Sequence, residues 1–245
     1  WRDDSLYRWR SLLLVPALVA LGCALLLPWL GTGQFNIWVA LAVLLGVWVV
    51  AGLVQDLVQR RRGAPWLQTL RRQTASYWGM VLAHCGFAAV LIGVVATSQY
   101  SIERDLKMSP GQSETLAGYR FEFVETLRLR GPNYIADGAR FEVFVGDRPV
   151  AEMLAEKRSY LASGSLMTEA AIDAGLFRDL YVAMGEPVGA DGAWAIRLHY
   201  KPMVRWMWLG ALGMGAGGLV TVFDRRYRRR RVAQSDVGVA NVAPA

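Results

Sequence analysis

The sequence predicts a mainly α-helical polytopic membrane protein that crosses the bilayer four times and carries a small β-rich domain outside it. Three observations support this fold class. Apolar residues make up 54% of the chain and are gathered into four long blocks. Arginine clusters separate these blocks instead of being spread along the chain. The stretch 98–202, between the third and fourth blocks, alternates apolar and polar side chains.

Each apolar block is long enough to cross a membrane as a helix. The hydrocarbon core is about 30 Å thick and a helix rises about 1.5 Å per residue, so a span needs about twenty residues. The expected spans are about 11–30, 35–54, 77–97 and 203–223.

Arginine placement predicts the orientation, because basic residues concentrate on the cytoplasmic side of membrane spans. The clusters precede the first span, fill the connection between the second and third, and follow the fourth. Their members are Arg2, Arg8 and Arg10; Arg60, Arg61, Arg62, Arg71 and Arg72; and Arg225, Arg226, Arg228, Arg229, Arg230 and Arg231. We therefore expect a cytoplasmic N-terminus, with 1–76 holding two spans and an arginine-rich cytoplasmic loop. The basic tail 224–245 is expected in the cytoplasm and 98–202 in the periplasm.

The cytoplasmic arginine clusters account for the formal net charge of +7. The outer stretch 98–202 has fifteen acidic and twelve basic residues, a net charge of −3. The run RRYRRRR at 225–231 could by itself suggest nucleic acid or anionic lipid. We interpret it as a topology signal that also contacts membrane lipids, and we expect no nucleic-acid partner.

The outer stretch is expected to fold as a β-rich domain. Phe121 and Phe123 alternate with polar residues, as do the apolar residues of 194–200. Residues 146–149 predict a turn, and 168–174 predict a helical segment. The two cysteines, Cys23 and Cys85, lie in apolar blocks, so the outer domain has no thiol chemistry. No residue of this domain is assigned a catalytic role, and we expect it to bind or position a partner.

His84 is the one ionisable residue deep inside a predicted span, about 10 Å from its cytoplasmic end. Such groups are costly in a membrane and usually face a partner, and neutral imidazole is a common haem-iron ligand. Gly79 and Gly86 would open space for a flat cofactor, together with Ala83 and Ala88, and Phe87 could stack on it. The alternative is a hydrogen bond to a neighbouring helix.

His199 cannot share a haem with His84. It lies at the outer end of the fourth span, whereas His84 lies about thirteen residues, or about 20 Å, inside the third. A methionine or a group outside this chain would therefore complete the iron site, and His199 is expected to be a surface or interface residue. In the fourth span, Gly213 and Gly217 form a GxxxG pair that lets a second helix approach closely. Trp206 and Trp208 are expected as interface anchors.

Several segments together resemble a known family. They occur in order as Tyr77-Trp78-Gly79-Met80 through His84, Glu103-Arg104-Asp105, Gly131-Pro132-Asn133-Tyr134, Glu156-Lys157-Arg158 with Tyr160, Met167 to Asp173, Arg178-Asp179-Leu180-Tyr181, Gly185-Glu186, and Lys201-Pro202 with Arg205-Trp206. With these segments the chain resembles the C-terminal portion of CcmF, the haem lyase subunit of System I cytochrome c maturation. At one position the chain departs from the family pattern, because Ala155 stands where a proline is expected before Glu156.

The resemblance implies an enzyme of the bacterial inner membrane. CcmF-type proteins accept haem, their substrate, from the periplasmic chaperone CcmE. They attach it through thioether bonds to the CxxCH cysteines of apocytochrome c. The implied partners are CcmH/CcmI-type lyase subunits, holo-CcmE and apocytochrome c, with quinol as a further candidate.

The resemblance also implies a resident haem b. One axial histidine of that haem lies in the helix that His84 matches, and the other lies in an earlier helix, outside this chain. The family's tryptophan-rich haem-handling segment, with its two flanking histidines, is absent here as well. The chain belongs either to a split family member or to a fragment, and because it starts at Trp1 and not at Met, we expect a piece of the full enzyme that is inactive alone.

The residues themselves also allow two functions other than that of a haem lyase. The chain could be a structural subunit whose outer domain docks a partner, with His84 as a packing residue. It could also be an electron-transfer b-type cytochrome with quinol as donor. Arg104, Arg158 and Arg178 are candidates for contacts with haem propionates, and ordinary surface ion pairing is the other interpretation.

Overall fold

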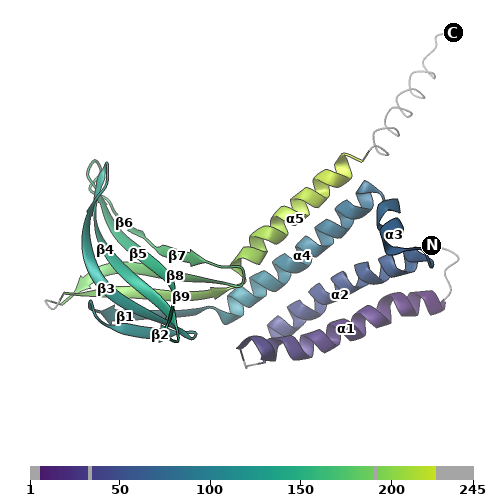
Figure 1. Cartoon of the computed structure of the whole chain (residues 1–245), viewed down its shortest axis with the longest axis horizontal. Helices are drawn as coiled ribbons and strands as arrows, with labels where there is room; N and C mark the ends of the chain where they lie inside the picture. The colour runs from purple at the N-terminus through teal and green to yellow at the C-terminus, as the bar shows by residue number, and fades with distance from the viewer. Residues whose placement is uncertain (1–5, 33–34, 190–191, 225–245) are drawn as a thin grey trace, which may run out of the picture. The chain divides into compact units, whose positions relative to one another are not determined.

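The computed structural model describes residues 6–32, 35–189 and 192–224. The chain forms two compact units, which are treated separately below (Figure 1). The helical unit lies within Trp1–Val95 and Trp206–Ala245, and the β unit is Ala96–Arg205. Arg2, the basic cluster 225–231 and nearly all of the predicted tail 224–245 lie outside the described residues.

The described helices coincide with the four predicted spans and add one short helix. They are α1 (Leu6–Thr32), α2 (Ile37–Arg61), α3 (Trp66–Arg72), α4 (Ala75–Tyr100) and α5 (Val204–Val222). The short α3 follows Pro65, in the connection that the sequence predicted only as a loop.

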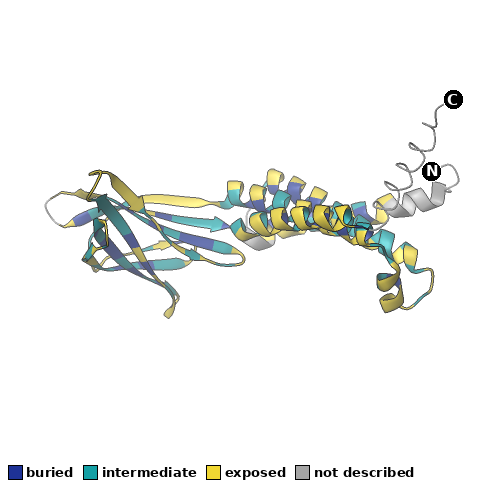
Figure 2. Cartoon of the chain, turned by 90° about the horizontal axis from the view of Figure 1, so that it is seen from above, coloured by how far each residue is buried: buried dark blue, intermediate teal, exposed yellow. Residues whose placement is uncertain are grey.

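Two of the helices, α2 and α4, are long and apolar enough to cross a membrane, with hydropathies of 2.7 and 2.2. The described apolar part of α1, Leu13–Trp29, is shorter than a full span. Crossing by α1 and α5, and the inside–outside orientation, stay predictions. Exposed residues cover much of the helix surface (Figure 2), and many of them are large and apolar.

Local sequence sets the ends of α2. The Asn36 side-chain oxygen accepts hydrogen bonds from the backbone nitrogens of Trp38 and Val39, at 2.9 and 3.3 Å. This satisfies amide groups that the first turn of a helix leaves unpaired. At the other end, Arg62 and Gly63 adopt positive φ values and stop the helix.

Helices α4 and α5 approach so closely that their glycines touch the opposite backbone. A Cβ atom added to Gly86 would lie 2.5 Å from the carbonyl oxygen of Gly210. One added to Gly79 would lie 2.5 Å from the carbonyl oxygen of Gly217. The predicted role of Gly217 in close helix packing is therefore confirmed, with Gly79 and Gly86 as its counterparts on α4.

Polar groups fix the first turn of α4. The buried carboxylate of Asp224, just after α5, accepts hydrogen bonds from the Ser76 backbone nitrogen and hydroxyl, at 2.9 and 2.7 Å. Thr74 adds a hydrogen bond from the Tyr77 nitrogen. On another side of α4, Gly46 of α2 contacts Ile92. Helix α4 is thus held by both α5 and α2.

The β unit is a two-sheet sandwich. Its strands are β1 (Ile102–Met108), β2 (Ser113–Leu116), β3 (Tyr119–Arg130), β4 (Tyr134–Val145), β5 (Arg148–Tyr160), β6 (Leu166–Glu169), β7 (Ala171–Ala174), β8 (Arg178–Val188) and β9 (Ala193–Pro202). One sheet has the order β1-β9-β8-β7 and the other β2-β3-β4-β5-β6, with every pairing antiparallel.

The alternation in sequence correctly located the sandwich core. Phe121, Phe123 and Phe141 are fully buried, and the rings of Phe123 and Phe141 stack at 4.8 Å. Ile196 and Leu198 of β9 are also buried. The turn predicted at 146–149 joins β4 to β5, with Gly146 at a positive φ of 60°.

The helix predicted around 168–174 is wrong. This segment instead forms β6 and β7, which are edge strands paired with β5 and β8. Its alanine and glutamate residues have high helix propensity, but propensity is a weak preference that strand pairing overrides.

The prediction from the α4–α5 contact is that Gly217→Val lowers the free energy of unfolding by about 1–3 kcal/mol, because the added atoms overlap Gly79 and Ala83. Gly218→Val is the matched control, since its added Cβ meets nothing within 4 Å. Denaturation of the complete protein in detergent, followed by circular dichroism, measures both. Equal stability of the two variants would contradict the tight contact.

Candidate functional site

The imidazole of His84 is exposed on α4 and has a defined orientation. Its Nδ1 lies 2.8 Å from the carbonyl oxygen of Met80, one helical turn earlier. Because a carbonyl oxygen only accepts, this hydrogen bond belongs to the tautomer that has its proton on Nδ1, and in that tautomer the Nε2 lone pair is available. Among the described residues no partner contacts Nε2. A histidine fixed through one ring nitrogen, with the other free, has the arrangement of a typical metal ligand.

The small residues around His84 do not make room for a cofactor as the sequence suggested. Gly79, Ala83 and Gly86 form the contact with α5, and Ala88 is buried on the side that meets α2. Phe87, one turn beyond His84, stays 49% exposed. His84 and Phe87 therefore form the open side of α4, and the small residues hold the helix in place.

The described residues fit one half of a haem iron site. His84 supplies an imidazole nitrogen, and the only other histidine in the sequence is His199. Across the described part of the chain, no cluster of three histidine, cysteine or acidic residues could hold a metal ion. A second ligand to the metal would therefore be a methionine or a group outside this chain.

His199 lies on the outer face of the β1-β9-β8-β7 sheet. It pairs in register with Glu103 and Tyr181, its Nδ1 is 3.5 Å from the Glu103 carboxylate, and its ring meets Tyr181 edge-on at 6.0 Å. Burial lowers the pKa of His199 below its ordinary value of 6.5, although the Glu103 carboxylate opposes this shift. His199 thus belongs to a surface cluster of the sandwich.

All three arginines considered for propionate contacts have carboxylate partners within the sandwich. Arg104 pairs with Glu114, and Arg158 pairs with Glu156 at 2.8 Å. Arg178 pairs with Asp173 and donates to its backbone carbonyl oxygen at 2.9 Å. These contacts favour ordinary ion pairing.

Arg178 also joins the two sheets. Its Nε lies 3.3 Å from the hydroxyl of Tyr119 on β3, and its guanidinium carbon lies 5.1 Å from the centre of that ring. Asp173, its carboxylate partner, is on β7 of the other sheet. One planar guanidinium therefore holds two sheets and the β7–β8 turn together.

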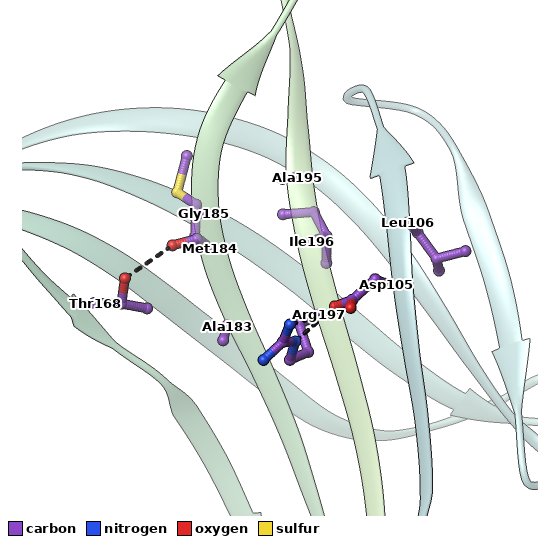
Figure 3. A pocket seen from close by; sticks show the side chains of 9 residues that line it. All are labelled: Asp105, Leu106, Thr168, Ala183, Met184, Gly185, Ala195, Ile196 and Arg197. Carbon is purple, nitrogen blue, oxygen red and sulfur yellow. Dashed lines mark hydrogen bonds and ion pairs between the residues drawn. The ribbon is translucent and has the colours of Figure 1, made fainter.

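A shallow cavity of about 430 Å³ lies on the outer face of the β1-β9-β8-β7 sheet (Figure 3). Ala183, Gly185 and Ala195 line it, and the guanidinium of Arg197 pairs with Asp105 through bonds of 2.6 and 3.0 Å beside it. Arg197 and Asp105 are 92 residues apart, so only the strand register brings them together. The lining residues include no nucleophile and base in contact.

Two helices of membrane-spanning length and apolarity, with a β-sandwich inserted between α4 and α5, are consistent with a membrane-associated protein that carries a sandwich domain. Comparison with known proteins agrees. Residues 99–202 match the family described as the CcmF C-terminal beta-sandwich. A solved structure named Cytochrome c Heme Lyase CcmF has the same fold, with a TM-score of 0.69 and 16% identity. This match covers 91% of the present chain and 36% of that one.

Sequence identity to curated relatives identifies the family to which the chain belongs. The chain is 46% identical over 93% of its length to the cytochrome c-type biogenesis protein CcmF of Pseudomonas aeruginosa. It is 41% identical over 94% of its length to the CcmF protein of Escherichia coli K12. The present chain belongs to the CcmF family. It spans 34% of the length of each of these two relatives.

The environment of His199 predicts a pH dependence. Its pKa in the folded protein lies below the ordinary value of 6.5, so the unfolded chain binds the proton more readily. Stability should therefore fall as the pH drops below about 6.5 and continue to fall until the folded-state pKa is passed. Melting temperatures measured across this range should decline less in His199→Gln. An identical decline in the two proteins would contradict the assignment.

The contacts of Arg178 predict that Arg178→Lys lowers the free energy of unfolding by about 1–2 kcal/mol. Lysine keeps the charge but cannot reach Asp173 and Tyr119 at the same time. Arg128→Lys is the control, because that side chain is 74% exposed and pairs with Asp137 alone. Chemical denaturation compares the two variants. Equal losses would show that the shape of the Arg178 guanidinium is unimportant.

Proposed function

We propose that this chain is part of a cytochrome c haem lyase in which α4 supplies His84 as an axial ligand of an intramembrane haem b. The observation that carries the proposal is the state of the imidazole, with Nδ1 fixed to the Met80 carbonyl oxygen and Nε2 unpartnered among the described residues. Membership of the CcmF family supports it, because a solved relative is named a cytochrome c haem lyase.

The contacts of α4 suit this role. The α5 contact at Gly79 and Gly86 and the Asp224 bonds to Ser76 limit rotation and sliding of the helix that bears the ligand. The hydrogen bond from Nδ1 to the Met80 carbonyl oxygen fixes the orientation of the ring. Haem iron, when bound, would supply one-electron chemistry. A second ligand would come from a histidine outside this chain.

The sandwich would position the reaction partners. Apocytochrome c, a holo haem chaperone of the CcmE type and CcmH/CcmI-type subunits are the proposed partners, and quinol is a candidate electron donor. Haem itself would be the substrate, joined to the cysteine thiols of apocytochrome c through thioether bonds. In support, the outer face of the sandwich exposes ion pairs such as Arg197 with Asp105, which suit contacts with polar groups of a partner. This chain alone would be inactive.

The proposed topology has four spans in the bacterial inner membrane, with both termini cytoplasmic and 98–202 periplasmic. It is supported by the arginine clusters and by the agreement of α1, α2, α4 and α5 with the four apolar blocks. A sandwich inserted between α4 and α5 then lies wholly on one side of the membrane.

The test is the reduced-minus-oxidised visible spectrum of the complete protein, beside cytochrome c assembly in cells. His84→Ala should lose both the b-type signal and assembly. Cys85→Ala, at the neighbouring position on the same helix, should keep both. A full signal in His84→Ala would contradict the ligand role.

Two other spectral results would favour the alternatives. No b-type signal in the parent protein would indicate a structural subunit. A signal lost in His84→Ala with assembly unaffected would indicate an electron-transfer cytochrome.

A further inference from the structure

The short helix α3 (Trp66–Arg72) lies between two helices that are long and apolar enough to cross a membrane. Helix α2 ends at Arg61, and α4 begins at Ala75. Figure 1 shows α3 at the end of the helical unit where α2 stops and α4 starts. A short connection between two spans emerges at the membrane surface, because spans end where the apolar core of the bilayer ends.

Contacts hold the start of α3 against the last turn of α2. The guanidinium carbon of Arg61 lies 4.8 Å from the centre of the Trp66 ring, and Arg61 Nε donates to the Ala64 carbonyl oxygen at 2.8 Å. Thr69 is only 3% exposed, so one side of α3 is covered. At the other end of α3, the Gln73 side chain donates to the Thr69 carbonyl oxygen at 3.0 Å. Helix α3 is therefore a fixed part of the helical unit.

The rest of α3 divides into an apolar side and a polar side. Successive helix residues are about 100° apart around the axis, which places Trp66, Leu67 and Leu70 within a sector of about 100°. The polar residues fill a second sector of about the same width, and they are Gln68, Arg71 and Arg72. Tryptophan and leucine opposite basic residues are typical of helices that lie in a membrane interface.

The apolar side of α3 is largely exposed. Trp66 is 45% exposed and Leu67 is 60% exposed, although Thr69 of the same short helix is buried. The Arg61 guanidinium lies over the Trp66 ring and leaves the rest of that side open. Adjacent exposed apolar side chains are unfavourable in water, and tryptophan is enriched at the boundary between headgroups and acyl chains. This side of α3 therefore suits a lipid interface.

The charges beside α3 suit the headgroups of anionic lipids. Arg62, Arg71 and Arg72 are exposed, and none of them pairs with a carboxylate among the described residues. The acidic residue near the end of α2, Asp56, already pairs with Arg60 at 2.6 Å. The charges that stay unpaired are therefore positive, opposite in sign to lipid phosphate.

We propose that α3 is an interfacial helix, with Trp66 and Leu67 at the boundary between headgroups and acyl chains. Arg62, Arg71 and Arg72 contact the phosphates of anionic lipids. Lipid is the occupant because the helices on both sides of α3 are of membrane-spanning length and the unpaired charges are positive. The inference rests on the proposed crossing by α2 and α4. It is independent of haem binding and of the side of the membrane that the connection faces.

The experiment places a single cysteine in the complete protein, at Leu67→Cys on the apolar side of α3, at Gln68→Cys on its polar side, or at Val54→Cys in α2. Val54 is 57% exposed and reports on the span itself. All other cysteines, including Cys23 and Cys85, are replaced by alanine. Each variant carries an environment-sensitive fluorophore in nanodiscs of phosphatidylcholine and phosphatidylglycerol. Quenching is measured with phosphatidylcholine that bears a nitroxide near the headgroup end of its acyl chain.

The expected result is blue-shifted emission and strong quenching at Leu67→Cys and Val54→Cys, with water-like emission and weaker quenching at Gln68→Cys. Water-like emission at Leu67→Cys beside a quenched Val54→Cys would overturn the interfacial helix and leave the spans intact. Water-like emission at Val54→Cys would overturn the proposed topology and this inference with it.

Two further results would also overturn the interfacial helix. Equal emission and quenching at Leu67→Cys and Gln68→Cys would show that lipid does not distinguish the two sides of α3. Blue-shifted emission at Leu67→Cys without quenching would show that protein, and not lipid, covers the apolar side. Circular dichroism confirms that each labelled variant is folded.

The arginines predict a preference among lipids at the same position. Moving the nitroxide from phosphatidylcholine to phosphatidylglycerol should increase quenching at Leu67→Cys, because anionic lipid gathers beside the arginines. Replacing both Arg71→Gln and Arg72→Gln should reduce this increase, while quenching by the labelled phosphatidylcholine stays. Equal quenching by the two lipids before the arginines are replaced, or an unchanged increase afterwards, would overturn the phosphate contact.

Discussion

The backbone contact between α4 and α5 is the constraint on which the rest of this chain depends. Gly79 and Gly86 leave no space for a side chain against α5, so the two helices can pair in one register. Asp224 fixes the first turn of α4, and Thr97 binds Pro202 near its last turn. The sandwich is inserted between these two helices, and the His84 side of α4 is left open.

The sequence predicted the elements whose pattern is local and repeated. Apolar blocks located the long helices, and alternation located the core strands that contain Phe121 and Ile196. It failed at 168–174, because the edge strands there are stabilised by partners far along the chain and their own residues favour a helix. It also missed α3, which is too short to leave a clear apolar period.

The sequence singled out His84 as the candidate site residue, and its role stays a prediction, whereas its contacts could not be predicted. His84 stood out as an ionisable residue within an apolar block. Its bond to the Met80 carbonyl oxygen depends on side-chain rotation, which sequence does not specify. The neighbouring glycines were correctly noticed and wrongly interpreted, since small residues in a span can admit either a cofactor or a helix. The Asp105–Arg197 pair depends on strand register, which no local motif encodes.

In the proposed function, Nε2 of His84 binds haem iron on the exposed side of α4. Rescue of the His84→Gly variant by free imidazole in the complete protein is the sharpest test of this role. His84→Gly removes the exposed imidazole, and free imidazole can then bind the iron in its place. The b-type spectrum should be lost in this variant and should return when imidazole is added. A spectrum that is intact without imidazole would contradict the claim.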